Sequence, residues 1–400
     1  MNHSHENGIE IQLIPEAYYG DSLTLSAFAF QFELTPEERE NRLSQMSSDP
    51  KWGAFVNGQL ASQLTIISLQ TWIQGKPMAM GGIASVSTWP EFRRGGLVGR
   101  LLGEALRNMR AENQTVSFLH PFQFGFYRRF GWETYTDYKK YEIPAELLPK
   151  LPPQPGRVVR LKEEEAVAAL NPLYTAYAAR YNGTLVRTEE WWKKRILERK
   201  KGTAAVYADD EGRAKGYVLY QVKNQVLTVH ELVHLDHGAR LGLWRFLSDH
   251  DSMIDKVVLQ APVDDRLPFL LDNPRIKQEL VPYFMARIVD AAAFLEEYPF
   301  NSGSESTFKL EITDEHASWN QRSFVVTVDE SGTAHVDKDE EKDCDVPSVR
   351  CSIQTLSAMM LGYQRPDFLR EIGRLEAGAE AADALERLIP ARTTYLPDFF

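Results

Sequence analysis

The sequence predicts two tandem α/β units, the second a degenerate copy of the first, followed by a smaller α+β domain. The chain has 400 residues, and because one hydrophobic core seldom grows beyond ~250–300 residues, it should hold two or three domains. Strand-like runs, a helical segment and a further strand follow one another in residues 1–150, and this order returns in residues 151–292. Residues 293–400 differ, because strands that look antiparallel there precede the helices.

In the first unit, Thr35 and Pro36 indicate the start of a helix, because threonine is a favoured N-cap and proline a favoured first helical residue. Leucines and alanines in residues 97–113 recur at helical spacing and form one apolar face. Short apolar runs predict strands at residues 9–20, 54–70 and 116–119.

A domain boundary is predicted at residues 148–156, where four prolines and a glycine cannot continue a helix or a central strand. In place of the first unit's glycine-rich turn, the second unit has residues 236–240, Asp-His-Gly-Ala-Arg, so we expect no nucleotide there. Strands are expected at residues 158–161, 204–207, 216–222, 226–229 and 256–259, and helices at 162–181, 188–200 and 238–249.

The third domain is predicted to be α+β, and the acidic stretch 337–345 within it to be a solvated hairpin. The chain ends in Phe399 and Phe400, which is apolar for a terminus and predicts a buried end. Strands are expected at residues 308–312, 323–328 and 348–353, and helices at 354–362 and 380–388.

Composition narrows the function classes. The net charge of −11 disfavours nucleic acid as a partner and suits a cationic or amine ligand. No apolar run reaches the ~20 residues that span a bilayer, and residues 1–7 lack the basic and apolar regions of a signal peptide. Cys344 and Cys351 do not make a disulfide framework, so we expect the reducing cytosol as the compartment, with no membrane partner.

The most informative segment is residues 81–102, in which a β-branched run ends at Pro90 and a leucine-rich helix follows two arginines and two glycines. Glycines let backbone N–H groups approach a ligand, and a helix N-terminus carries partial positive charge. Arg93, Arg94 and the N–H groups of residues 95–99 therefore predict a pyrophosphate site. The segment has neither P-loop nor G-x-G-x-x-G spacing, and the alternative is an ordinary basic turn.

This segment resembles the acetyl-CoA signature of the GCN5-related N-acetyltransferases. Arg93 and Gly96 match the signature, whereas Val98 stands where glycine or alanine is usual. Residues 126–132 resemble the same family's later motif, in which Tyr127 would meet the CoA thiol. The resemblance implies acetyl-CoA as cosubstrate, bound by Ser85, Val86, Arg93, Arg94, Gly95, Gly96, Leu97, Val98 and Gly99.

The order of all three domains, together with a C-terminal phenylalanine, resembles the Eis (enhanced intracellular survival) family. The resemblance implies two tandem acetyltransferase folds and a sterol-carrier-like domain. It further implies that Tyr127 protonates the leaving thiolate and that the Phe400 carboxylate, threaded into the first domain, acts as base. It also implies aminoglycosides or lysine-like amines as acceptors, and a hexamer. No cysteine lies near the predicted pyrophosphate site to carry an acyl group, so direct transfer in a ternary complex is expected.

Two weaker signals complete the predictions. Phe28, Phe30 and Phe32 alternate and, with Asp398, are candidates for the substrate pocket; a strand face in the core is the alternative for the phenylalanines. The run from His230 to His234 matches the metal motif H-E-x-x-H, but a strand-like lead-in argues against the required helix, so no metal is expected. A metal hydrolase and a non-catalytic lipid- or partner-binding protein remain the alternative functions.

Overall fold

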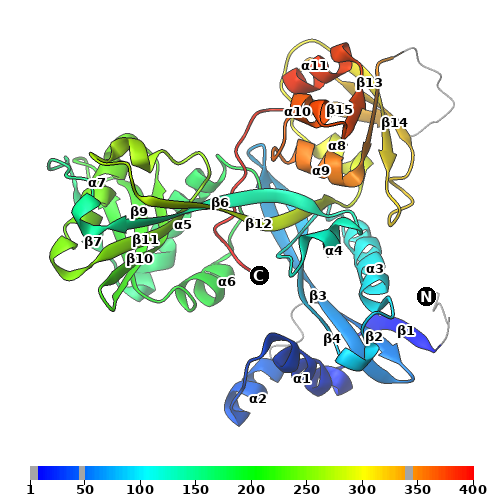
Figure 1. Ribbon diagram of the computed structural model, residues 1–400, viewed down its shortest axis with the longest axis horizontal. Coiled ribbons are helices and arrows are strands. Elements are labelled where there is room, and N and C mark those ends of the chain that lie inside the picture. The colour runs from blue at the N-terminus through cyan, green and yellow to red at the C-terminus, as the bar shows by residue number, and fades with distance from the viewer. Residues whose placement is uncertain (1–7, 45–49, 338–345) are drawn as a thin grey trace.

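The computed structural model describes residues 8–44, 50–337 and 346–400, and Figure 1 shows three bodies joined by two long strands. Twelve strands form one sheet in the order β1-β2-β3-β4-β5-β12-β6-β11-β10-β9-β8-β7, and five form another in the order β15-β14-β13-β16-β17. The predicted class, two α/β units and an α+β domain, is confirmed. The signal-peptide prediction, Cys344 and nearly all of the acidic stretch lie outside the described residues.

The first unit forms one end of the large sheet, with α3 packed on it. α2 begins where the sequence predicts, because Glu38 Oε2 accepts the backbone N–H of Thr35 at 2.8 Å and Thr35 Oγ1 accepts that of Glu38 at 3.2 Å. The strand expected over residues 9–20 is wrong beyond Leu13, since Tyr19 already starts a helix. The elements are β1 Ile9–Leu13, α1 Tyr19–Phe30, α2 Pro36–Ser44, β2 Lys51–Val56, β3 Gln59–Ile73, β4 Lys76–Thr88, α3 Leu97–Ala111, β5 Val116–Leu119 and α4 Phe124–Arg128.

Two strands cross between the first and second units. β6 (Glu133–Pro144) follows α4 in the chain but pairs with β11 of the second unit, where Tyr141 lies opposite Leu259. β12 (Lys277–Ile288) returns from the second unit and pairs with β5 through Met285. The sheet therefore runs unbroken past the loop in which the first domain boundary is predicted.

The second unit repeats the plan of the first. β10 and β11 pair in parallel with α7 between them, as β4 and β5 do with α3 between them. α5 packs on one face of this half-sheet and α7 on the other. The elements are β7 Arg157–Arg160, α5 Glu163–Ala178, α6 Glu189–Trp191, a π-helical turn Trp192–Leu197, β8 Thr203–Ala208, β9 Ala214–Lys223, β10 Val226–His234, α7 His237–Ser248 and β11 Lys256–Ala261.

The third domain packs helices against the five-stranded sheet. Its strands are not all antiparallel as expected, since β13 and β16 run parallel. The first predicted helix is found over Ile353–Met360, and α10 was not predicted. The elements are α8 Ala291–Glu297, β13 Ser306–Thr313, β14 Ser323–Val328, β15 Ala334–Asp337, β16 Ser348–Ser352, α9 Ile353–Met360, α10 Pro366–Glu371, β17 Leu375–Ala377 and α11 Ala379–Leu388. Throughout the described ranges, every helix is too short or too polar to cross a lipid bilayer.

Candidate active site

A split in the sheet lies between β4 and β5. The two strands pair in parallel only from Met80 to Ile83, and beyond that point β4 stays paired with β3 alone. At the split β4 carries a bulge, because Ala84 and Ser87 lie opposite Thr65 and Gln63, two residues apart. Ser85 adopts the left-handed conformation with φ 55°. The split exposes one edge of β4 and the bulge re-aims its backbone at Val86, so an extended ligand can bind there through backbone groups.

The predicted pyrophosphate site, residues 93–96 and called the cradle from here on, follows this strand as an exposed turn. Arg94 and Gly96 both have left-handed backbones, with φ 64° and 75°, and the turn leads directly into α3. Gly96 is the N-cap and has no side chain to bind the first amides of the helix. The first helical hydrogen bond runs from Arg100 N to Gly96 O at 3.1 Å, so the amides of Leu97 to Gly99 have no helical acceptor. A helix start of this kind suits an anion.

Packing, rather than ligand approach, explains Gly99. A Cβ at Gly99 would lie 2.9 Å from the ring of Phe130, whereas one at Gly96 would meet no atom within 4 Å. The two motifs singled out in the sequence therefore touch each other through Gly99 and Phe130. Arg93 folds back on the strand, where its Nε donates to Thr88 O at 3.4 Å.

Tyr127 lies in α4, one residue before its end, and is almost completely buried among apolar side chains. Its ring makes edge contacts with Phe126 and Phe122, at centroid distances of 5.2 and 5.3 Å. Burial raises the pKa of Tyr127 above its ordinary value, so the phenol keeps its proton at neutral pH. The protonated phenol can donate a hydrogen bond, and its raised pKa makes it a weaker acid than an exposed tyrosine.

The C-terminal segment, red in Figure 1, leaves the third domain and ends beside β12 and α6. Tyr395 N donates to Asn182 O at 2.9 Å, which ties the segment to the second unit. The prediction of a buried end is confirmed for Phe400 but wrong for Phe399, whose side chain is half exposed. The ring of Phe400 packs 5.0 Å from that of Phe284 and over Gly82 of β4.

Tyr127 and Phe400 lie on opposite faces of the sheet at the split. Successive residues of a strand face opposite ways. A Cβ at Gly81 would clash with Met109 of α3, whereas a Cβ at Gly82 would lie 2.8 Å from the ring of Phe400. Tyr127 belongs to the same apolar cluster as the buried side chains of α3. Tyr127 and Phe400 therefore belong to the layers on the two faces of the sheet that contains β4.

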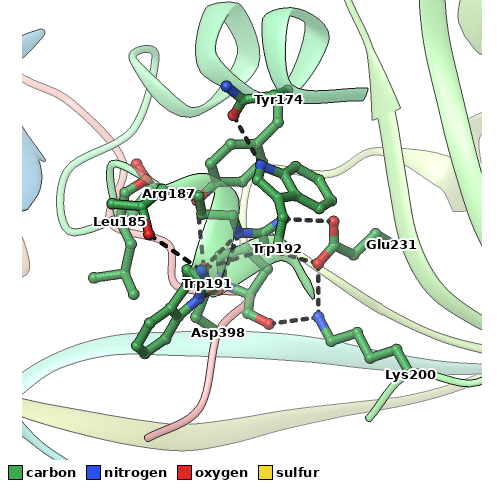
Figure 2. Close-up of polar contacts among 12 residues, drawn as sticks. Tyr174, Leu185, Arg187, Trp191, Trp192, Lys200, Glu231 and Asp398 are labelled. Atoms are coloured by element: carbon green, nitrogen blue, oxygen red, sulfur yellow. Dashed lines mark hydrogen bonds and ion pairs between the residues drawn. The ribbon is translucent and has the colours of Figure 1, made fainter. Parts of the chain in front are cut away.

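A buried ionic network, shown in Figure 2, holds the C-terminal segment in place. Arg187 binds Asp398 at 3.0 Å and Glu231 at 2.7 Å, and all three side chains are buried. Trp191 Nε1 also donates to Asp398, at 2.8 Å, and Lys200 binds Glu231 at 2.7 Å. Burial alone would raise the pKa of Glu231, but the two cations outweigh it and lower that pKa to about 2. The Asp398 carboxylate thus anchors the chain end. Its oxygens already accept hydrogen bonds from Arg187 and Trp191, and its predicted place in a substrate pocket stays a prediction.

Glu231 is the glutamate of the H-E-x-x-H run. The run lies in β10, as the sequence predicts, and not in the helix that a shared metal requires. His230 contacts Lys201 O at 3.1 Å, and His234 packs against Tyr177. Among the described residues, no group of three or more histidine, cysteine or acidic side chains gathers as a metal site would.

The three candidate pocket phenylalanines do not form a strand face. Phe28 and Phe30 lie on α1 and are half exposed, so that alternative is wrong. Phe28 packs against Trp89, one residue before the turn that leads to the cradle, at a centroid distance of 5.0 Å. Phe32 lies beneath the guanidinium of Arg42, at 4.8 Å. Their place in a substrate pocket remains a prediction.

Sequence reasoning missed His120 and Tyr283. The ring of His120 lies 5.0 Å from that of Phe399, and partial burial lowers the pKa of this histidine. Tyr283 donates to Asp398 O at 3.0 Å. His120 directly follows β5, so its position at a strand end was a usable signal; Tyr283, more than a hundred residues from Asp398, offered none.

Comparisons with known proteins agree with this architecture. Two family models described as an acetyltransferase (GNAT) domain match residues 10–135 and 183–288, and a sterol carrier protein domain matches residues 291–397. An uncharacterised N-acetyltransferase of Streptomyces griseus is 24% identical over 379 residues, covering 87% of this chain and 88% of its own. An uncharacterised N-acetyltransferase of Streptomyces avermitilis is 25% identical over 429 residues, which cover 99% of this chain and 100% of the relative.

Solved structures show the same fold over the whole chain. A probable N-acyltransferase of Enterococcus faecalis superposes with a TM-score of 0.91 at 28% identity, covering 98% of this chain and 99% of its own. Eis1 of Mycobacterium abscessus superposes with a TM-score of 0.80 at 20% identity, and the match covers 98% of this chain and 100% of Eis1. The chain is therefore a GCN5-related (GNAT) N-acetyltransferase, Eis-like in its order of two acetyltransferase domains and a sterol-carrier domain.

Proposed function

We propose that this enzyme transfers the acetyl group of acetyl-CoA directly to a primary amine of a small molecule. The observation that carries the proposal is the split between β4 and β5, which leads into the uncapped start of α3. The exposed turn of Arg93 to Gly96 and the first amides of α3 would hold the pyrophosphate. The bulged edge of β4 would hold the thioester, with a backbone N–H near Val86 on its oxygen.

The proposed reaction has two proton steps. The acceptor nitrogen attacks the thioester carbon, the carbon–sulfur bond breaks, and Tyr127 gives its proton to the departing sulfur. The Phe400 carboxylate takes the proton from the nitrogen, directly or through water. With an ordinary pKa of ~3.5 a C-terminal carboxylate is a weak base toward a free ammonium, so we propose that it acts as the amine attacks. Their positions on opposite faces of the split support these roles.

The second unit is proposed to bind no nucleotide. Its helix α7 begins with Asp236, whose carboxylate accepts the amide of Ala239 at 2.8 Å. A carboxylate at this position takes the place and the charge that a phosphate would need.

A thiol-release assay with acetyl-CoA tests the proposal. The amine panel would contain aminoglycosides, lysine, simple diamines and short peptides, which cover the acceptor classes that the Eis resemblance suggests. We expect free thiol to appear only when an accepted amine is present, and mass spectrometry to find one acetyl group on that amine. Absence of thiol release with every amine would refute the proposal and favour a non-catalytic binding protein. Hexameric assembly is proposed from the resemblance alone, and light scattering of the purified protein tests it.

A further inference from the structure

A cavity of about 320 Å³ lies where the C-terminal segment meets the second unit. Small-molecule sites usually measure ~300–1,000 Å³, so this cavity suits a compact ligand. Pro397, Asp398 and Phe399 form part of its wall, directly ahead of Phe400. The remaining lining residues are Lys140, Arg195, Ile196, Arg199, Lys200, Thr228, Val229, His230, Val258, Leu259, Gln260 and Tyr283.

The cavity occupies the second unit's counterpart of the acetyl-CoA split. β10 and β11 pair in parallel only as far as Val229 and Leu259, and β10 then bulges at His230. The degenerate copy has therefore kept the opening while Asp236 fills the anion site at the start of α7. The C-terminal segment now passes over that opening.

Cations dominate the lining of this cavity. In the network beside it, the two positive charges of Arg187 and Lys200 are balanced by the two negative charges of Glu231 and Asp398. Asp398 is the only carboxylate in the lining, and Arg187 and Trp191 already bind it. The network therefore contributes no net charge to the cavity.

Lys140 and Arg199 are additional to that network. Both side chains line the cavity, Lys140 from β6 and Arg199 from the residues that follow the π-helical turn. Glu279 of β12 lies opposite Lys140 in the sheet but outside the cavity lining, and no ion pair of Lys140 or Arg199 is found among the described residues. Burial and the nearby guanidinium of Arg42 in α2 lower the pKa of Arg199 and outweigh the opposite effect of Glu198. The whole chain carries −11, which makes a local excess of positive charge informative.

We propose that this cavity binds a carboxylate group of the acceptor, so that the enzyme acetylates small amino-acid-like amines in preference to polycations such as aminoglycosides. The inference rests on the proposed acetyl transfer. Arginine and lysine are the usual partners of carboxylates, and a polycation would be repelled by the same lining. The apolar side chains of Ile196, Val258 and Phe399 would cover the carbon skeleton of the acceptor.

Matched acceptor pairs test this specificity. Each pair shares its amine and differs in the carboxylate: lysine and 1,5-diaminopentane, 4-aminobutyrate and butylamine, phenylalanine and 2-phenylethylamine. We expect kcat/KM to be higher for the carboxylate member by roughly 10- to 100-fold, the effect of one or two charge-assisted hydrogen bonds. In the double variant Lys140→Gln/Arg199→Gln this ratio should fall toward one, with the KM for acetyl-CoA unchanged.

Lys193→Gln is the matched control, because Lys193 lies in the π-helical turn that precedes Arg199, is exposed and pairs with Glu189. It should keep the wild-type ratio. The inference is overturned if the amine member is preferred, if the double variant leaves the ratio unchanged, or if it raises the KM for acetyl-CoA instead.

Titration calorimetry separates this inference from the proposed function, since it needs no turnover. Suppose that 4-aminobutyrate binds the wild type but not the double variant, and that butylamine does not bind the wild type. The inference that the cavity binds a carboxylate then holds even when no thiol is released. In that case only the proposal of acetyl transfer fails. If both compounds bind equally, or neither binds, the inference about the cavity fails whatever the thiol assay shows.

Discussion

Removing the Asp398 carboxylate should release the C-terminal segment without unfolding the domains. Asp398 is fully buried and binds Arg187 at 3.0 Å and Trp191 at 2.8 Å. In Asp398→Ala, Arg187 keeps Glu231 but loses its second carboxylate, and Trp191 loses its acceptor. Removing one partner of a buried ion pair costs about 3–5 kcal/mol. Because the lost partner is on the segment itself, most of this cost should weaken its docking.

A cost of this size lowers the ratio of docked to free segment by about 10²- to 10⁴-fold. Digestion with a carboxypeptidase reports that ratio, since the carboxypeptidase can remove Phe400 only when the C-terminal segment is free. We expect the release of phenylalanine from Asp398→Ala to be faster by about this factor, and kcat for thiol release to fall with little change in the KM for acetyl-CoA.

The control for this experiment is Asp272→Ala, which removes an exposed carboxylate away from the segment. Circular dichroism should show wild-type secondary structure for both variants, because neither substitution removes an apolar side chain from the cores that hold the sheets. Wild-type rates of phenylalanine release and of thiol release in Asp398→Ala would refute the reasoning. They would show that the packing of Phe400 alone docks the segment.

Three further predictions concern the two faces of the split. Tyr127→Phe and deletion of Phe400 should each lower kcat by about 10²- to 10⁴-fold in steady-state assays, the usual worth of a general acid or base, and wild-type turnover in either would remove its assigned role. Gly82→Ala should also lower kcat, since its Cβ would lie 2.8 Å from the Phe400 ring, whereas Gly303→Ala adds a Cβ in open space and should not. Because the pKa of Glu231 is lowered to about 2, its contribution is complete above its unfolded value of ~4.3 and is lost as pH falls toward 2. Carboxypeptidase protection, measured after brief exposure to each pH with an acid-stable enzyme, should therefore decline between pH 4 and 2, and constant protection across that range would contradict it.

The parts of the fold that the sequence predicted well have local signals. The helix expected over residues 97–113 is Leu97–Ala111, because its buried leucines recur every three or four residues. The strand 116–119 is found with the predicted bounds, and the cradle turn lies between strand and helix as expected. Spacing within a dozen residues determines each of these features.

The parts that the sequence did not predict depend on contacts between distant residues. Nothing near residue 187 indicates that its guanidinium pairs with Asp398, 211 residues later. The exchange of β6 and β12 between the two units is likewise a matter of sheet order, which apolar patterning does not encode. The strand alternative for Phe28 and Phe30 was wrong because alternation over a few residues is weak evidence against a helix. The apolar residues of α1 are not gathered on one face, so the helical pattern was weak.

The two acetyltransferase units have diverged at matching positions, and these differences account for their separate roles. Gly96 leaves the first amides of α3 without a side-chain acceptor, whereas Asp236 supplies one to α7. After the bulge of β10 comes Glu231, which is buried and binds Arg187, whereas β4 at its own bulge stays open toward the split. One unit thus leaves the start of its helix open, where we propose the anion site, and the other holds the C-terminal segment. Because that segment begins in the third domain and its last residue packs on β4 of the first, no single domain can complete the proposed active site alone.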